Sequence, residues 1–438
     1  MPEDNTTRCP GDSAERRVAI LTERWGDAGS EAQRFVRQVA GVLALEADVD
    51  VVCTTGRERR SVADGVFTVH QLAARSWRNT LRRDLLVRAL AVDDPPPAVG
   101  GHASPGTLGS GPPRSGPALS SGADEWFRRH DEEIVAQATA HLREIDPNLL
   151  VVAGLAHFGL AEALTASWPD VPVVVLPLLE EPGLLRLSPA AQLIARADAV
   201  LVASPDEERL LRPTIPSGSL QKLHDVGATV TISGGARRES VTALADQDYL
   251  AVLCDTPGTS EAAVGPYIRM LSACFPRNPV AALHRDRVAV WREGGCQEQL
   301  APASSPADLG RVLAWARLTV DLRSHSLYAG GSLESLRYGT PIVVPAGGRA
   351  HQHAALGNGG LWFRDLAEMA GAVGGALDPT LREHLSTAGR IYADSRYGST
   401  ARFLDRVRSA CAFGRQIPTE ASEDDVTSSP VTSSPVTS

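Results

Sequence analysis

The sequence of 438 residues lacks several features that assign a chain to a class at once. Only one of its 43 basic residues, Lys222, is a lysine, so a site that needs a basic side chain has to use arginine. Aromatic residues make up 5% of the chain, and the six cysteines are scattered without a CxxC pair. This pattern excludes a small disulfide scaffold and favours cysteines that are buried and reduced.

Long apolar runs and an excess of positive charge are also missing. No stretch reaches the roughly 18 consecutive apolar residues that a membrane helix needs. Residues 1–17 contain no apolar segment of the kind found in signal peptides. The net charge of −9 disfavours sequence-independent binding to nucleic acid. We therefore expect a cytoplasmic protein without a nucleic-acid partner, and a peripheral contact with a membrane stays open.

Three common signatures of nucleotide and nucleophile sites do not occur. The chain has no GxGxxG, no GxxxxGK[ST] and no GxSxG, which disfavours dinucleotide oxidoreductases, P-loop NTPases and α/β-hydrolases. His351 and His353 have no cysteine or carboxylate at metal-ligand spacing, so we expect no metal site.

Three segments are expected to lie outside any folded core. Residues 1–15 form a polar leader, residues 93–122 are dense in Pro, Gly and Ser, and residues 417–438 end in the repeat SSPVTSSPVTS. Segments of this composition bury too little apolar surface to fold, so we expect them to be disordered.

The rest of the chain alternates short apolar runs with amphipathic patterns. The predicted strands are 17–22, 49–53, 148–153, 171–176, 199–203, 249–254, 280–283, 318–322 and 341–344, and helices are predicted at 30–45 and 124–145. Continuous β-branched runs between helices are typical of parallel sheets buried on both faces.

The strands fall into two series, separated by a Gly-rich segment. We predict an α/β protein with two Rossmann-like, doubly wound parallel-sheet domains at 16–230 and 248–400, a linker at 231–247 and a C-terminal helix at 401–416. Ligands of such sheets bind at the carboxyl ends of the strands, which predicts a site in a cleft between the domains.

The stretch 318–349, LTVDLRSHSLYAGGSLESLRYGTPIVVPAGGR, is the best candidate site. It predicts a strand, a loop with Gly330 and Gly331, a helix that begins near Ser332 and carries Glu334, and another strand. A helix N-terminus with free N–H groups can bind phosphate, and a carboxylate one turn further can accept two ribose hydroxyls. A plain tight turn, with Glu334 on a solvent-exposed face, explains the same residues equally well.

The same stretch resembles the nucleotide-sugar glycosyltransferases of GT-B architecture, in particular the retaining Glu-x7-Glu group (glycosyltransferase family 4-like). SLESLRYGTPIVV is similar to the second half of the pattern PSxxExFGxxxxEAMAxGxPVV, and it places Glu334 on the second glutamate, which holds the donor ribose. VAILTERWGDAGSEAQRFVRQVAGVL resembles the group's first strand, glycine loop and helix, with Gly29 facing the donor or acceptor. ADAVLVAS resembles a further strand that ends in serine.

The sequence departs from this pattern in two places. Ser326 stands where the group has its first glutamate, so the motif is degenerate and the catalytic residue is unknown. After the strand 249–254 the group has an Arg and a Lys that neutralise the donor diphosphate, but here Asp255 and Glu261 follow. An arginine from elsewhere would have to supply the charge, and the candidates are Arg323, Arg349, Arg237 and Arg238.

The resemblance implies a hexosyl-type glycosyltransferase that moves a sugar from a nucleoside-diphosphate sugar to an unknown acceptor, a glycan, lipid or small molecule. It implies retention of configuration, no metal and no bound cofactor, with the donor on the C-terminal domain and the acceptor on the N-terminal domain. The implied donor-binding residues are Glu334, Leu333, Ser332, Gly331, Gly330, Arg323 and Gly29. His157, after the strand 148–153, would line the cleft, although an ordinary loop histidine accounts for it as well.

An alternative is a catalytically impaired GT-B protein that acts as a partner or scaffold. A nucleotide-sugar epimerase of the same fold is disfavoured, because the sequence has no matching cluster of catalytic acids. Two or more arginines within reach of Glu334 would favour the enzyme. A cleft lined by Asp255 and Glu261 without arginine would favour the scaffold.

Overall fold

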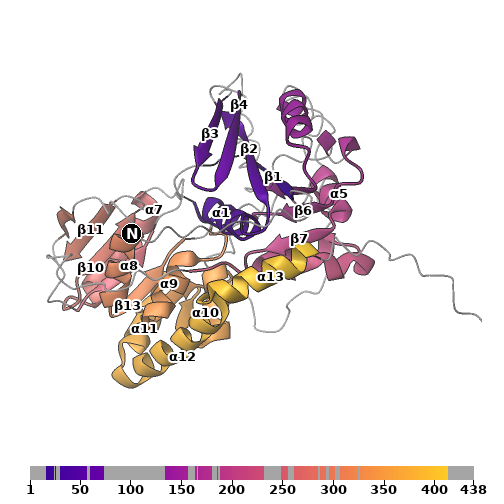
Figure 1. Cartoon of the computed structure of the whole chain (residues 1–438). Helices are drawn as coiled ribbons and strands as arrows, with labels where there is room; N and C mark the ends of the chain where they lie inside the picture. Colours follow the sequence, from indigo (N-terminus) through magenta and orange to yellow (C-terminus); the bar gives the residue numbers. More distant parts are fainter. Residues whose placement is uncertain are drawn as a thin grey trace, which may run out of the picture.

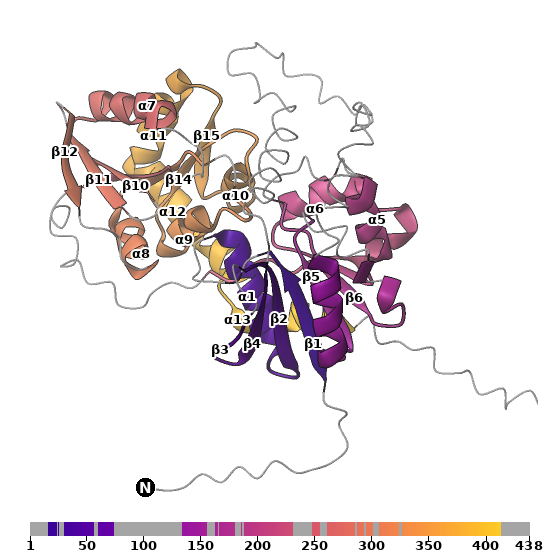
Figure 2. The same ribbon diagram turned by 90° about the horizontal axis from the view of Figure 1, so that it is seen from above.

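The computed structural model describes two α/β halves that lie side by side, with helix α1 (Glu31–Leu43) at their boundary (Figure 1, Figure 2). The described residues are 16–23, 25, 30–56, 60–73, 134–155, 163–164, 166–179, 185, 188–230, 248–254, 261–284, 287–292, 295–300, 306–323 and 326–412. The predicted leader, insert, linker and tail lie outside these residues.

The first half is built on an eight-stranded sheet of order β3-β4-β2-β1-β5-β6-β7-β8. Its strands are β1 (Arg17–Thr22), β2 (Asp48–Gly56), β3 (Arg60–Asp64), β4 (Phe67–Ala73), β5 (Leu149–Ala153), β6 (Val173–Leu176), β7 (Ala199–Val202) and β8 (Leu223–Asp225). Every neighbouring pair is parallel except the hairpin of β3 and β4. The helical segments of this half include α1, residues 134–145, α5 (Ser188–Arg196), α6 (Pro205–Leu211), η3 (Arg212–Thr214) and η4 (Ser217–Lys222).

The second half is built on a seven-stranded sheet of order β12-β11-β10-β9-β13-β14-β15. Its strands are β9 (Leu250–Leu253), β10 (Val280–His284), β11 (Arg287–Arg292), β12 (Gly295–Leu300), β13 (Leu318–Asp321), β14 (Ile342–Pro345) and β15 (Gly360–Phe363). The neighbouring strands β10, β9, β13, β14 and β15 pair in parallel, while β11 and β12 extend one edge of the sheet with antiparallel pairing. The helices of the later chain are α7 (Glu261–Cys274), α8 (Pro306–Trp315), α9 (Gly330–Tyr338), α10 (Arg349–Gly357), α11 (Leu366–Leu377), α12 (Pro379–Tyr397) and α13 (Thr400–Ala412).

The apolar runs of the sequence become the central strands of both sheets. The strands β5, β6, β7, β9 and β13 are buried along their whole length, as expected for sheets covered on both faces. Helix α1 begins at Ser30, whose hydroxyl accepts the Gln33 N–H at 3.1 Å, and it buries Phe35 and Val39 against the first sheet. The predicted α/β architecture with two parallel-dominated sheets is confirmed.

The chain returns to its first half at the end. Helix α12 packs against α9 and α10, and α13 then packs against α1 and β7. Phe403 and Val407 of α13 share one apolar core with Phe35 of α1. The predicted C-terminal helix therefore covers the first sheet, and its described part ends at Ala412.

Two hairpin edges, β3–β4 and β11–β12, were not predicted from the sequence. The pattern of β3, RSVAD, is almost fully exposed, so it lacks the apolar run that marks the buried strands. Of the predicted helix at 124–145, residues 134–145 are helical and the rest lie outside the described residues. Within the described part of the chain, no helix is both long enough and apolar enough to cross a membrane.

Candidate functional site

The predicted strand, loop and helix of the stretch 318–349 are present as β13, a loop and α9. The loop turns into the helix at Ala329, which adopts a left-handed φ of 52°. The Ser326 hydroxyl accepts the Ala329 N–H at 2.8 Å and fixes this turn. At the other end, Gly339 has a φ of 80° and ends the helix, as a glycine at this position commonly does.

Gly330 and Gly331 allow close approach rather than a left-handed turn. Neither has a positive φ. A Cβ on Gly330 would lie 3.1 Å from the Glu31 carboxylate, and a Cβ on Gly331 would lie 3.0 Å from the guanidinium of Arg323. The bare backbone at the start of α9 therefore faces charged side chains, one of them from the other half of the molecule.

Arg323 is held beside this backbone by a carboxylate. Its Nε and Nη2 atoms lie 2.8 and 2.6 Å from the two oxygens of Asp321, at the end of β13. The Ser332 hydroxyl donates to the same carboxylate at 2.6 Å. Asp321 is buried, and the Nη1 atom of Arg323 lies 3.6 Å from Glu31 Oε1. The arginine is thus fixed at the N-terminus of α9.

Glu334 lies one turn into α9 and is not on a solvent-exposed face. A Cβ on Gly310 of α8 would come within 2.7 Å of its Oε1 atom, so the carboxylate rests directly on that helix. Burial raises the pKa of Glu334 to about 7, against the opposing charges of Arg34, Arg323 and Arg337. The carboxyl group is therefore partly desolvated and surrounded by arginines.

Two residues at this site, Glu31 and Arg34, come from α1 and were missed in the sequence. Glu31 is buried, and its carboxylate accepts hydrogen bonds from Ser326, Tyr328 and Gly330. Arg34 lies one turn further along, and its charge acts on both Glu31 and Glu334. An acid in the first turn of a helix is explained by the helix dipole alone, so its spacing carried no signal for a site.

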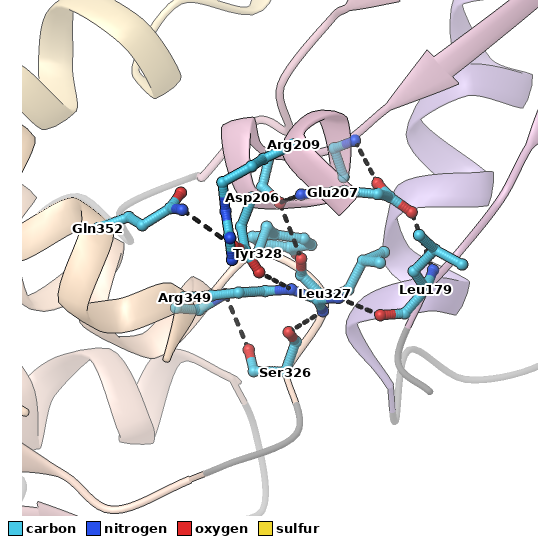
Figure 3. Close-up of polar contacts among 12 residues, drawn as sticks. Leu179, Asp206, Glu207, Arg209, Ser326, Leu327, Tyr328, Arg349 and Gln352 are labelled. Atoms are coloured by element: carbon cyan, nitrogen blue, oxygen red, sulfur yellow. Dashed lines mark hydrogen bonds and ion pairs between the residues drawn. The ribbon is translucent and has the colours of Figure 1, made fainter. Parts of the chain in front are cut away.

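A second set of contacts joins the same loop to the first half of the molecule (Figure 3). Arg349 of α10 donates to the carbonyl oxygens of Ser326 and Leu179, and its Nε lies 3.4 Å from Asp206 Oδ2. Gln352 donates to Asp206 Oδ1 at 2.9 Å. Arg349, a candidate for the diphosphate, is therefore engaged in contacts between the two halves.

Glu207 supports these contacts from within α6. Its carboxylate accepts the N–H groups of Leu179 and Ala203 at 2.9 and 2.8 Å. Burial raises the pKa of Glu207, and the charge of Arg349 opposes this shift. The neighbouring Ser204 hydroxyl donates to the Leu327 carbonyl at 3.3 Å. The loop from Ser326 to Gly330 is thus held by α1 on one side and by α6 on the other.

The structure brings most of the predicted donor-site residues together. These are Arg323, Gly330, Gly331, Ser332 and Glu334, and Ser326, which stands in place of the motif's first glutamate, lies beside them. Leu333 is buried, and its N–H donates to the Ala329 carbonyl within α9, so it serves packing here. Gly29, His157, Asp255, Arg237 and Arg238 lie outside the described residues, as does the side chain of Glu261. No three His, Cys, Asp or Glu side chains of the described ranges are arranged to hold a metal ion.

The two Rossmann-like sheets and the return of the last helices define the class: the chain has the fold of the GT-B glycosyltransferases. It is similar in structure to sucrose-phosphate synthase from Thermosynechococcus elongatus, with a TM-score of 0.63, 14% identity, and coverage of 90% of this chain and 98% of that one. The α,α-trehalose 6-phosphate synthase from Burkholderia multivorans gives a TM-score of 0.61, 14% identity, and coverage of 91% and 99%. HepE from Anabaena, solved with UDP and glucose, gives 0.58, 13%, and coverage of 91% and 100%.

The comparisons of sequence give no match. No protein-family model matches the chain, and neither does any curated protein. The similarity therefore concerns the fold.

Proposed function

We propose that this protein is a glycosyltransferase that transfers a sugar from a nucleoside-diphosphate sugar to an acceptor. The observation that carries the proposal is the position of Glu334 at the N-terminus of α9, with Arg323 and Arg34 within electrostatic range of its carboxylate. A carboxylate can accept two hydroxyl hydrogen bonds from a ribose, and guanidinium groups match the geometry of phosphate oxygens. Both parts of a nucleoside diphosphate therefore have a partner here.

The arginines replace the basic pair that is missing after β9. Arg323 is already oriented by Asp321, so it loses little conformational freedom when it binds a phosphate. Arg34 approaches from α1, and its Nε is buried without a hydrogen-bond partner among the described residues. Two cations from opposite halves of the molecule would bind the diphosphate between them.

A uridine nucleotide is the first donor to test. HepE, which has a similar fold, was solved with UDP and glucose and with UDP-glucose. A trehalose-6-phosphate protein from E. coli, with a TM-score of 0.60 and 10% identity to this chain, was solved with UDP-2-fluoro glucose. The acceptor of this chain is left open, because His157 and Gly29, which the resemblance assigns to the donor–acceptor cleft, lie outside the described residues.

The departing diphosphate needs stabilisation of its negative charge. The positive end of the α9 dipole and the two arginines supply it, which supports transfer without a metal ion. Retention of configuration is part of the proposal through the resemblance to the Glu-x7-Glu group. Ser326 offers a hydroxyl where that group has a carboxylate, so we expect weaker or altered selection of the donor sugar.

The scaffold alternative loses its main support at Glu334. It expects a site with acidic residues and no arginine, whereas Arg34, Arg323 and Arg337 all act on this carboxylate. These charges favour a protein that binds an anionic ligand.

A thermal-shift panel of nucleoside diphosphates and nucleotide sugars tests the proposal. We expect the nucleoside diphosphate of one base to raise the melting temperature of the protein. The nucleotide sugar with the same base should be turned over with release of the nucleotide. A ligand at a hundred times its Kd adds about 2.7 kcal/mol to the unfolding free energy. No shift with any member of the panel would refute the proposed function.

A further inference from the structure

The Glu31 carboxylate occupies the donors at the start of α9. Its Oε2 accepts the Ser326 hydroxyl at 2.5 Å and the Tyr328 N–H at 3.0 Å. Its Oε1 accepts the Gly330 N–H at 2.7 Å and lies 3.6 Å from Arg323 Nη1. Three hydrogen-bond donors and one guanidinium of the second half thus converge on one carboxylate of the first half.

These contacts are stronger than the cost of burying the charge. Burial alone would raise the pKa of Glu31, but the charge of Arg323, the hydrogen bonds from Ser326 and Tyr328, and the charge of Arg34 outweigh it. The pKa of Glu31 lies below its ordinary value as a result. The carboxylate is therefore an ionised anion in a site built for an anion.

The same donors are those that a phosphate would use. A phosphate group presents two or three oxygens of like charge, which accept from backbone N–H groups, a hydroxyl and a guanidinium in the same way as a carboxylate. A Cβ at Gly330 would lie 2.8 Å from the Tyr328 ring and 3.1 Å from Glu31 Oε1, so the glycine eases the close approach of this oxygen to the backbone. A phosphate and the Glu31 carboxylate cannot bind these donors at the same time.

We propose that Glu31 is an autoinhibitory contact, an internal substitute for a phosphate of the ligand, which the incoming diphosphate displaces. The proposal rests on the proposed function, because it places the diphosphate at the start of α9. When Glu31 leaves, Tyr328, Gly330 and Ser326 donate to the phosphate instead. The hydrogen bonds between Glu31 of α1 and the loop are then lost, so ligand binding also removes one of the contacts between the two halves of the molecule.

Arg34 gives this exchange a second partner. It lies on the same helix as Glu31, one turn away, and its Nε is buried without a hydrogen-bond partner in the described structure. With Glu31 in place, the charge of Arg34 interacts with the carboxylates of Glu31 and Glu334. With a diphosphate in place of the Glu31 carboxylate, the same guanidinium faces the ligand.

Removal of the carboxylate tests the proposal. A ligand that competes with a protein group binds with its intrinsic affinity multiplied by the fraction of molecules in which that group is released. We therefore expect Glu31→Ala to bind inorganic pyrophosphate and UDP about tenfold more tightly than the wild type in calorimetric titration. Glu31→Gln keeps an acceptor oxygen but loses the charge, so it should give a smaller gain and guards against misfolding of the alanine variant.

Glu368→Ala is the matched control. It also removes an acid from the first turn of a helix, α11, but its side chain is exposed and pairs with Arg364. We expect its affinity for both probes to equal that of the wild type. An unchanged or lower affinity of Glu31→Ala for pyrophosphate overturns the autoinhibitory role.

Hydrogen exchange of the 326–333 segment separates the two proposals. The Tyr328 and Gly330 amides should exchange faster in Glu31→Ala than in the wild type, and pyrophosphate should restore their protection. If they stay protected in Glu31→Ala, the inference fails. If pyrophosphate restores protection but no nucleotide binds either form, the inference stands and the proposed function fails.

Discussion

The guanidinium of Arg323 forms a two-pronged hydrogen bond with the carboxylate of Asp321, with donor–acceptor distances of 2.8 and 2.6 Å. The two residues flank the end of β13, and the Ser332 hydroxyl completes the carboxylate's partners. This pairing leaves the remaining edge of the guanidinium directed at the start of α9, where Glu31 now lies. Asp321 is accordingly a positioning residue for the cation of the site.

Replacement of Arg323 tests this assignment. We expect Arg323→Ala to weaken UDP binding by ten- to a hundredfold, since a charged hydrogen bond to phosphate contributes about 1.5–3 kcal/mol. Arg323→Lys should recover little of this loss, because an ammonium group cannot pair with Asp321 in two places. Calorimetric titration of UDP into the two variants measures their affinities. An Arg323→Lys variant that binds UDP as tightly as the wild type would contradict the assignment.

Gly310 sets the position of the Glu334 carboxylate. A methyl group there would lie 2.7 Å from Glu334 Oε1, so Gly310→Ala should push the carboxylate out of place and lower donor affinity. The added atom would also lie 2.7 Å from the Tyr338 hydroxyl. Both displaced atoms are at the far ends of their side chains, so we expect the variant to fold. Gly371→Ala in α11 is the control, because nothing lies within 4 Å of the added atom. The control should keep its affinity and gain about 0.5–1 kcal/mol of stability. Equal affinities of the two variants would refute this role.

The raised pKa of Glu334 predicts a pH dependence of stability. The carboxyl has a native pKa of about 7 against an ordinary value of 4.5, so the native state binds more protons between these pH values. Unfolding free energy should therefore fall as pH rises from about 4.5 through 7, by at most about 3 kcal/mol. Glu334→Gln should remove this decline and be more stable than the wild type at pH 8. Urea unfolding at pH 5 and pH 8 measures the difference, and parallel curves for both proteins would contradict the expectation.

Arg349 holds the two halves together through Asp206, Ser326 and Leu179. We expect Arg349→Ala to lower the unfolding free energy by about 3 kcal/mol, because it removes the cation that opposes the burial of Glu207 and leaves Asp206 with its exposed partner Arg209. Arg212→Ala removes an exposed pair with Glu208 and should cost less than about 0.5 kcal/mol. Denaturant titration of both variants measures the two losses of unfolding free energy. Losses of similar size would contradict the prediction.

The positions of the buried strands along the chain could be predicted from the sequence, and the edge hairpins could not. Continuous apolar runs such as NLLVVA and YLAVLC predict strands that are covered on both faces, and these two runs form β5 and β9. The strand β3 exposes nearly every side chain, and its pairing with β4 is set by the hairpin rather than by an apolar pattern. Local polarity alone does not distinguish such a strand from a loop.

Only the part of the site that the second half of the molecule contributes could be predicted from the sequence. Glu334, Gly330, Gly331 and Arg323 lie within one short stretch, where spacing along the chain translates into neighbours in space. The Glu31 carboxylate accepts from Ser326 across 295 positions of the chain, and that contact depends on how the two halves of the molecule meet. No periodicity in the sequence encodes this arrangement, so Glu31 and Arg34 became visible only in the folded structure.

Calorimetric titration of UDP into the wild type and into Glu334→Ala tests the central claim most directly. The account predicts a one-to-one complex with the wild type and an affinity at least tenfold lower for Glu334→Ala, because the ribose loses its acceptor. Binding of equal strength to both proteins would contradict the donor site at α9.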